Sequence, residues 1–251
     1  MQLPYMRIWW MMTISVAIAS AEGPRTPVLV ELFTSEGCSS CPPADLLLSR
    51  LQQSQPIPGV AVITLSEHVD YWNQLGWTDP FSSAVLTERQ RQYGAALRGE
   101  GVYTPQMIID GKTGFVGSDS QQALQAISAA AKTPKTAVDL RCGGAPSTIS
   151  VRIDGSAADA DITLAIAENG LQSNVTRGEN RGRLMAHAGV ARSITLIGLA
   201  KKQQPFSAEP KLAIEKSWRR ENLSAVVFLQ DRASRRILGA GQIALSACAV
   251  N

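Results

Sequence analysis

The chain has 251 residues, a net charge of +3 and a hydrophobic fraction of 45%. This length accommodates one large domain or two of ordinary size, and the composition, with 18% charged residues, excludes an intrinsically disordered protein. The basic residues form scattered pairs such as Lys201-Lys202, without the basic stripe and stacking aromatics of nucleic-acid-binding proteins, so no nucleic-acid partner is expected.

The first 21 residues have the pattern of a secretory signal. Arg7 is the only charged residue among them, and it precedes an apolar run, 8–18, that is shorter than the roughly 20 residues needed to span a bilayer. The tripeptide Ala-Ser-Ala at 19–21 is the small-x-small pattern that signal peptidase accepts. We expect residues 1–21 to be a signal peptide cleaved after Ala21, a periplasmic or secreted mature protein, and no stable membrane span after cleavage. An uncleaved anchor is the alternative.

The sequence after the signal predicts a strand, a turn, a helix and a second strand. The apolar run 28–33 predicts a buried strand. It leads through a turn into Cys-Ser-Ser-Cys-Pro-Pro at 38–43, where proline suits a first helical turn because its missing N–H would be unpaired there. Leucines within 46–51 give this helix an apolar face, and 60–65 is the next strand, which completes a βαβ unit.

The following residues predict two more helices and a hairpin. An irregular, aromatic segment at 66–81 comes first. The remaining expected elements are a helix at 82–98, hairpin strands at 107–109 and 115–116 joined by an Asp-Gly turn, and a helix at 117–131 capped by serine or aspartate.

Beyond Thr133-Pro134, which has the composition of a linker, the pattern changes to short strands separated by turn residues. The expected strands are 137–142, 148–153, 161–167, 172–176, 194–199, 225–229 and 237–243. Repeated short strands at this spacing are typical of an antiparallel sandwich. We therefore predict two domains, an α/β domain at 24–133 and an all-β, sandwich-like antiparallel domain at 135–251.

Cys38 and Cys41 form a C-x-x-C pair at the start of the first predicted helix. Unpaired N–H groups and the helix dipole favour a thiolate there, so Cys38 is expected to be an exposed nucleophile and Cys41 to resolve its mixed disulfide. A zinc site would need a second closely spaced cysteine pair, and a c-type haem site would need histidine at position 42. Copper(I) held by the two thiolates, with His68, and an inert structural disulfide remain as alternatives to redox chemistry.

Long strings in the sequence carry a more specific resemblance. VELFTSEGCSSCPPAD, HVDYWNQLGWTDPF, RQRQYG, GVYTPQMIIDG and RGENRGRLMAHAGVARSI resemble an uncharacterised family of secreted thioredoxin-like proteins, known as a domain of unknown function. The resemblance implies a thioredoxin-like fold for residues 28–131 and a bacterial cell-envelope thiol–disulfide oxidoreductase with Cys38 and Cys41 as its catalytic pair. A copper-binding or adaptor module with the same fold and no turnover is the alternative. The family brings no established substrate.

The resemblance also implies roles for residues outside the cysteine pair. Thioredoxin-like folds place a cis proline beside the redox pair, so Thr104 and Pro105 are expected to hold the substrate strand, with an ordinary strand-initiating proline as the alternative. The aromatic segment is an insertion that follows the strand next to the redox strand, and this position leads us to expect Tyr71 and Trp72, with Trp77, to form a docking wall for the substrate. For these aromatic residues the alternative is a small core that buries them.

Three further residues complete the expected site and its support. Glu31 lies one residue upstream of thioredoxin's buried acid and is a candidate proton relay to Cys41; a structural pairing is the alternative, because one step along a strand turns the side chain to the opposite face. Cys142 and Cys248 lie near the start and the end of the β-rich part, and we predict a structural disulfide between them, with two free thiols as the alternative. No cofactor or metal is expected, and the predicted partner is a protein or small-molecule thiol or disulfide.

Overall fold

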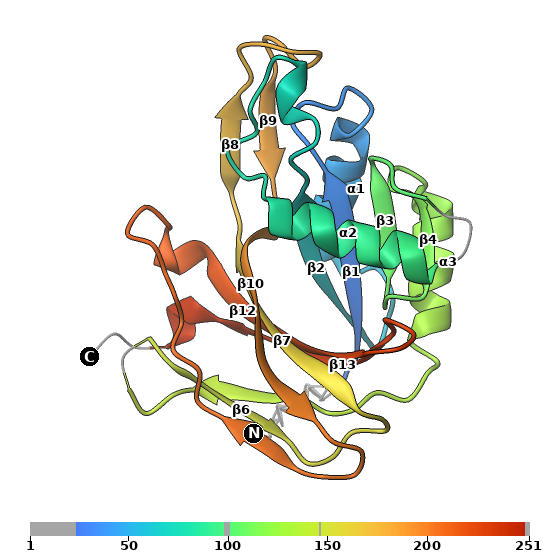
Figure 1. Cartoon of the computed structure of the whole chain (residues 1–251), viewed down its shortest axis with the longest axis vertical. Helices are drawn as coiled ribbons and strands as arrows, with labels where there is room; N and C mark the ends of the chain where they lie inside the picture. Colours follow the sequence, from blue (N-terminus) through green and yellow to red (C-terminus); the bar gives the residue numbers. More distant parts are fainter. Residues whose placement is uncertain (1–23, 98–100, 146, 249–251) are drawn as a thin grey trace, which may run out of the picture.

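The computed structural model describes residues 24–97, 101–145 and 147–248, so the expected signal peptide at 1–21 lies outside the described residues. Within them the chain has a mixed α/β fold with one large sheet (Figure 1). None of the helices in the described part of the chain is both long and apolar enough to cross a membrane.

The helices and strands follow the chain order of Figure 1. The N-terminal part contains β1 (Thr26–Thr34), α1 (Pro42–Ser54), β2 (Val60–His68), η1 (Asn73–Leu75), α2 (Ala84–Ala96), β3 (Gln106–Ile109), β4 (Thr113–Val116) and α3 (Ser120–Ala130). The C-terminal part contains β5 (Asp139–Cys142), β6 (Ile149–Ile153), β7 (Ala160–Glu168), β8 (Leu171–Asn174), β9 (Leu184–His187), β10 (Val190–Ala200), β11 (Phe206–Ala208), η2 (Arg220–Asn222), β12 (Leu223–Asp231), β13 (Ile237–Ala244) and η3 (Leu245–Ala247). The sequence analysis missed β9 and β11, which are too short to show a periodic pattern.

Eight strands form one mixed sheet in the order β13-β12-β7-β10-β2-β1-β3-β4. β1 runs parallel to β2 and antiparallel to β3. Val30 and Leu32 of β1 pack with α1 and α3 on one face, whereas Phe33 packs with Tyr93 of α2 on the other. Because both faces are covered, residues 28–34 are all buried, which explains the continuous apolar run in the sequence.

The two halves of the sheet meet between β2 and β10. Their parallel pairing is short, with Val190 opposite Ser66, and the Ser66 N–H donates to the carbonyl oxygen of Gly189 at 2.7 Å. Gly189 has a φ of +64°, and a Cβ at this position would lie 2.9 Å from the Thr64 hydroxyl, so the close approach requires glycine. The core at this junction draws on both halves: Leu29, Ile63, Leu65, Ala165, Ala167, Val226, Phe228, Ile237 and Ala240.

A second, three-stranded antiparallel sheet, β11-β6-β5, packs against β7 and β12. The expected division into a thioredoxin-like domain and a separate β-sandwich is not confirmed, because β7, β10, β12 and β13 continue the sheet that contains β1 and β2. The physical reason is that alternation along a strand indicates a buried face but not which neighbour covers it or which sheet the strand joins. The remaining two strands, β8 and β9, form a hairpin beside α1 (Figure 1).

Candidate functional site

The C-x-x-C pair lies in the turn between β1 and α1. A disulfide joins Cys38 and Cys41, with the sulfur atoms 2.17 Å apart and the Cα atoms 5.4 Å apart. Cys41 is the N-cap of α1 and Pro42 follows at the first helical position. The carbonyl oxygen of Cys41 accepts the N–H groups of Ala44 and Asp45 at 2.9 and 3.1 Å, so the pair sits directly at the positive end of the helix dipole.

The disulfide is covered, which corrects the expectation of an exposed Cys38. Both cysteines are 0% exposed. One segment that packs against this turn is the loop 175–183 between β8 and β9, in which the Asn180 amide donates to the carbonyl oxygens of Glu36 and Cys38, both at 2.9 Å. The Ser39 N–H donates to a Glu179 carboxylate oxygen at 3.1 Å. The sequence did not reveal these contacts because the loop residues lie about 140 positions further along the chain.

The structure brings Trp72 and Thr104 to the turn that carries the disulfide. The Trp72 indole N–H donates to the Thr104 hydroxyl at 2.8 Å, and a Cβ on Gly37 would lie 3.1 Å from the Cβ of Trp72. The Thr104–Pro105 bond is cis. Pro105 lies close to Ala44 in the first turn of α1. A Cβ added to Gly117 would lie 3.2 Å from the Cβ of each of them, so Pro105 is beside the start of the same helix.

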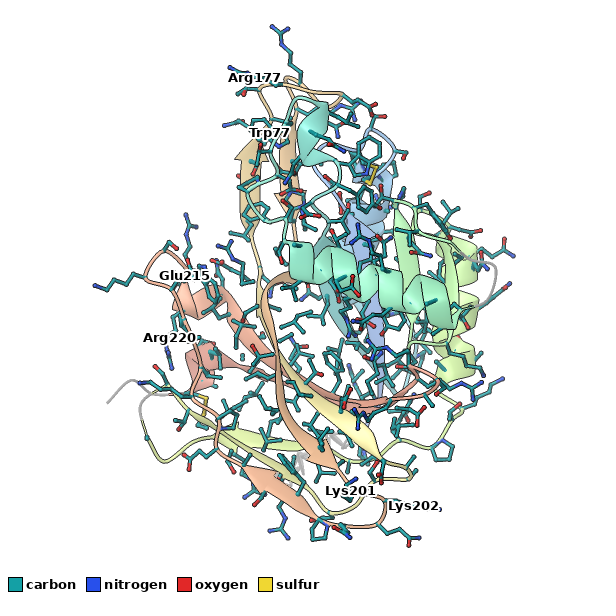
Figure 2. All side chains as sticks on the ribbon, viewed as in Figure 1. Trp77, Arg177, Lys201, Lys202, Glu215 and Arg220 are labelled. Carbon is teal, nitrogen blue, oxygen red and sulfur yellow. A yellow bond between two sulfur atoms is a disulfide. The ribbon has the colours of Figure 1, made fainter. Side chains whose placement is uncertain are left out.

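The remaining aromatic residues of the segment have internal partners. The Tyr71 hydroxyl donates to Gln90 at 3.2 Å, and Tyr71 and Trp72 pack against the core around Phe33. The Trp77 indole N–H donates to Glu36 at 2.8 Å. Figure 2 shows Trp77 close to the tip of the β8–β9 hairpin, where Arg177 is also labelled. These contacts are those of a small core, and a docking role for Tyr71 and Trp72 remains a hypothesis.

Glu31 does not face Cys41, which corrects its assignment as a proton relay. It is fully buried on the face of β1 opposite α1, where Arg89 of α2 forms a buried ion pair with it and the Tyr93 hydroxyl donates to it at 2.5 Å. Burial raises the pKa of neighbouring Glu67, and the carboxylate of Glu31 raises it further. The one-residue displacement along the strand is the reason, since it turns the side chain away from α1.

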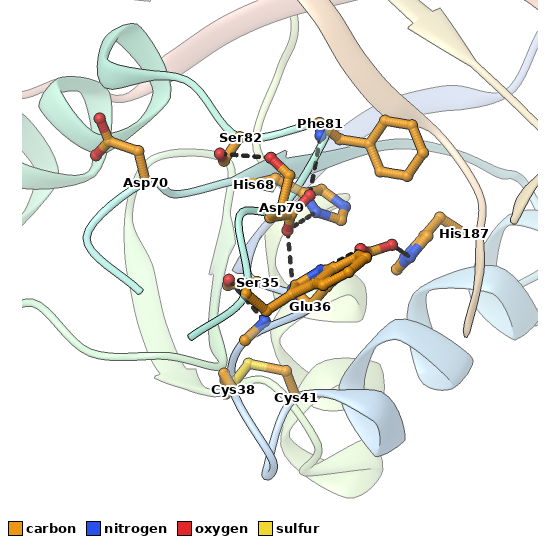
Figure 3. A network of polar contacts seen from close by, with 12 residues as sticks. Ser35, Glu36, Cys38, Cys41, His68, Asp70, Asp79, Phe81, Ser82 and His187 are labelled. Atoms are coloured by element: carbon orange, nitrogen blue, oxygen red, sulfur yellow. Dashed lines mark hydrogen bonds and ion pairs between the residues drawn. A yellow bond between two sulfur atoms is a disulfide. The ribbon is translucent and has the colours of Figure 1, made fainter. Parts of the chain in front are cut away.

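A cluster of buried acids and histidines lies behind the disulfide (Figure 3). His68 Nδ1 lies 2.7 Å from an Asp79 oxygen, and His187 Nε2 lies 3.0 Å from a Glu36 oxygen. The chain contains only two histidines, and their rings pack edge to face with centroids 4.7 Å apart. Burial acts to raise the pKa of Asp79, but the neighbouring His68 keeps this pKa below its usual value.

Asp45, in the first turn of α1, also belongs to this region. It is 6% exposed, and no well-formed hydrogen bond from the described residues reaches its carboxyl oxygens, although the nearby Thr34 hydroxyl acts to lower its pKa. Burial raises its pKa from 3.8 to about 7, against the opposing effect of His187. The sequence analysis missed Glu36, Asp45, Asp79 and His187. Glu36 and Asp45 lie close to the cysteines in the sequence, but no local sequence pattern indicates that they are buried together.

A second disulfide joins Cys142 of β5 to Cys248, which follows η3. The sulfur atoms are 2.12 Å apart, and the two residues are separated by 106 positions in the sequence. Over residues 24–97, 101–145 and 147–248, no group of three or more histidine, cysteine, aspartate or glutamate residues is arranged to hold a metal ion.

Comparison with known proteins adds a family and two similar structures. The family model described as "Protein of unknown function (DUF1223)" matches residues 29–230. The crystal structure of protein AGR_C_4864 from Agrobacterium tumefaciens is 29% identical, with a TM-score of 0.73 over 91% of this chain and 99% of that chain. HBP35 of Porphyromonas gingivalis is 15% identical, with a TM-score of 0.62 over 90% of this chain and 77% of that one, a likeness of fold alone. No curated protein matches the sequence.

Proposed function

The chain belongs to the DUF1223 family, whose description assigns no activity, and we propose from its own site that it is a thiol–disulfide oxidoreductase of the bacterial cell envelope with Cys38 and Cys41 as its redox centre. The observation that carries the proposal is the disulfide at the N-terminus of α1. Helical N–H groups and the dipole stabilise a thiolate at this position. The Ser40 hydroxyl, 3.4 Å from the sulfur of Cys38, is placed to donate to that thiolate.

The surrounding fold supports a thioredoxin-like redox centre. The strands next to the pair follow the order β2-β1-β3-β4, with α1 and α3 on one face and α2 on the other. A cis Thr104–Pro105 bond precedes β3 beside the start of α1. In the proposal Thr104 and Pro105 hold the substrate strand, as in other proteins of this fold, and Trp72 positions Thr104 through its indole N–H.

The proposed reaction needs no other oxidant or reductant. A substrate thiolate attacks the sulfur of Cys38, which breaks the Cys38–Cys41 bond and forms a mixed disulfide. Cys41 leaves as a thiolate and takes up one proton. The second thiolate of the substrate then attacks the substrate sulfur that is bonded to Cys38. The mixed disulfide breaks, and Cys38 leaves as a thiolate and takes up the second proton. Two electrons and two protons pass from the substrate dithiol to the protein, and the reverse sequence reduces a substrate disulfide.

The covering loop adds a step before this exchange. Both cysteines are 0% exposed, and in the proposal a substrate reaches Cys38 after loop 175–183 has moved away from the carbonyl groups of Glu36 and Cys38. The proposal therefore includes an opening of the β8–β9 hairpin before attack.

The proposal is tested with the full mature chain. A titration with reduced and oxidised dithiothreitol, read by mass spectrometry after alkylation, should show reversible formation of the Cys38–Cys41 disulfide, and the protein should accelerate the reduction of insulin. Cys38→Ser should abolish the acceleration. The matched control, Cys142→Ser with Cys248→Ser, removes the other disulfide. This variant should still accelerate the reduction of insulin. Absence of acceleration by the wild-type protein, or acceleration that survives Cys38→Ser, would disprove the assignment.

A further inference from the structure

A groove runs between α1 and the β8–β9 hairpin, next to the redox pair. Its volume is about 620 Å³, which lies in the range of small-molecule and peptide sites. One wall includes Pro42, Leu46 and Gln52 of α1, and the other is formed by residues 183–188 together with 169–172, which include the first two residues of β8. Pro42 directly follows Cys41, so one end of the groove reaches the disulfide turn.

The hairpin presents the edge of β9 to this groove. Neighbouring side chains of a strand point to opposite faces, yet all four residues of β9 line the groove, as they do when a strand meets it edge-on. Leu171 and Gln172 of β8 line it as well. The only ladder of β9 in the described residues is with β8. The Val175 N–H donates to the Arg183 carbonyl oxygen on the β8 side at 3.0 Å. Because backbone groups alternate along an antiparallel strand, those of Leu184 and Ala186 point away from β8, into the groove.

The side chains around this edge define the chemistry of a ligand. Leu46 and Leu184 line the groove from its two walls and are 51% and 62% exposed, so apolar surface on both walls is unpartnered. Arg183, also exposed, adds a positive charge. The acid of the lining, Asp45, is buried, so no exposed carboxylate neutralises the arginine within the groove.

We propose that this groove binds an extended peptide segment of a client protein, which adds to β9 as a third strand of the β8–β9 sheet. Its main chain pairs with Leu184 and Ala186, an apolar side chain packs between Leu46 and Leu184, and an acidic side chain pairs with Arg183. The inference rests on the proposed function, since a cysteine beyond the bound segment would be delivered to Cys38. The hairpin is then both the docking element and the cover of the disulfide.

A peptide without cysteine tests docking separately from exchange. The probe is a fluorescein-labelled peptide of sequence GSEVLVEVSG, titrated with the full mature protein and followed by fluorescence anisotropy. The expected result is saturable binding that Leu184→Gln weakens at least about fivefold, corresponding to about 1 kcal/mol. The matched control is Leu196→Gln on β10, at a leucine that is 58% exposed and outside the groove, and it should leave binding unchanged. The unaltered protein should bind GSEVLVEVSG more tightly than GSQVLVQVSG, in which glutamine replaces both glutamates. Arg183→Gln should abolish that difference in affinity.

A second measurement uses the unaltered protein. Amide hydrogen exchange of Leu184 and Ala186 should slow when the peptide is bound, because their N–H groups become paired. No binding, binding that Leu184→Gln leaves unchanged, or unprotected amides would overturn the docking proposal. A dimer of the protein that Leu184→Gln dissociates would also overturn it, by assigning the β9 edge to a second copy. Thiol–disulfide exchange activity without peptide binding would refute only the docking of a peptide in the groove. Peptide binding by a protein whose Cys38–Cys41 pair is inert would refute only the proposed oxidoreductase function.

Discussion

Replacement of Asp45 by asparagine tests the electrostatics behind the disulfide. Burial raises the pKa of Asp45 from 3.8 to about 7, and the carboxylates of Asp79 and Glu36 add to this, whereas His187 lowers it. The folded state therefore binds more protons than the unfolded state between about pH 4 and pH 7, and the free energy of unfolding falls as the pH rises through this window. At about 1.4 kcal/mol for each tenfold change in proton concentration, the stability lost by pH 8 is about 4 kcal/mol.

Asparagine has nearly the same shape and does not ionise, so Asp45→Asn should remove this loss. At pH 4 the two proteins should differ little, and at pH 8 the variant should be the more stable by up to about 4 kcal/mol. Urea unfolding at pH 4, 6 and 8 with both disulfides intact measures the difference. Asp154→Asn, at a side chain that is 82% exposed, is the control and should leave the pH dependence unchanged. A variant less stable than the wild type at pH 8 would refute the reasoning, because it would mean that the ionised carboxylate is stabilised by its surroundings.

The remaining predictions concern the cover and the second disulfide. Asn180→Ala removes two hydrogen bonds that hold loop 175–183 in place, worth about 1–3 kcal/mol together, so dithiothreitol should reduce Cys38–Cys41 about 5 to 150 times faster, with the reduction rate of Cys142–Cys248 in the same sample as the internal reference. An unchanged rate would show that the loop does not limit access. Removing the disulfide between Cys142 and Cys248, which closes a loop over 106 positions, should lower the free energy of unfolding in urea by about 4–5 kcal/mol. A loss below about 1 kcal/mol would contradict the loop-entropy argument.

The parts of the site that depend on neighbouring residues in the sequence could be predicted. The apolar run of β1, the proline at the start of α1 and the C-x-x-C spacing are local signals, and together they place the cysteines at a strand-to-helix turn. The Asp-Gly turn between β3 and β4 is another local signal, because Gly111 has a φ of +62° that favours glycine.

The parts that depend on contacts between distant residues could not be predicted. Glu31 and His187 have no local pattern that distinguishes a buried partner from an exposed side chain, and their partners, Arg89 and Glu36, lie 58 and 151 positions away. The contact of the Cys38 backbone with loop 175–183 is of the same kind. The expected separation into two domains is not confirmed, and the continuity of the sheet could not be predicted for a related reason: the sequence of β10 carries no sign that β2 is its neighbour.

These long-range contacts make the candidate site a joint product of both halves of the chain. The N-terminal half supplies the sulfur atoms, Glu36 and Asp79, and the C-terminal half supplies Asn180 and His187. Moving His187 away from the buried Glu36 would leave the carboxyl oxygen that it contacts unpaired, although the Trp77 indole N–H still donates to the other oxygen, and this costs free energy unless water reaches the group. In the proposed mechanism, opening the hairpin would admit that water and expose Cys38 in the same movement. The proposed exchange reaction therefore depends on the C-terminal half, and a fragment cut near residue 133 would retain the C-x-x-C turn while losing the contacts that cover it.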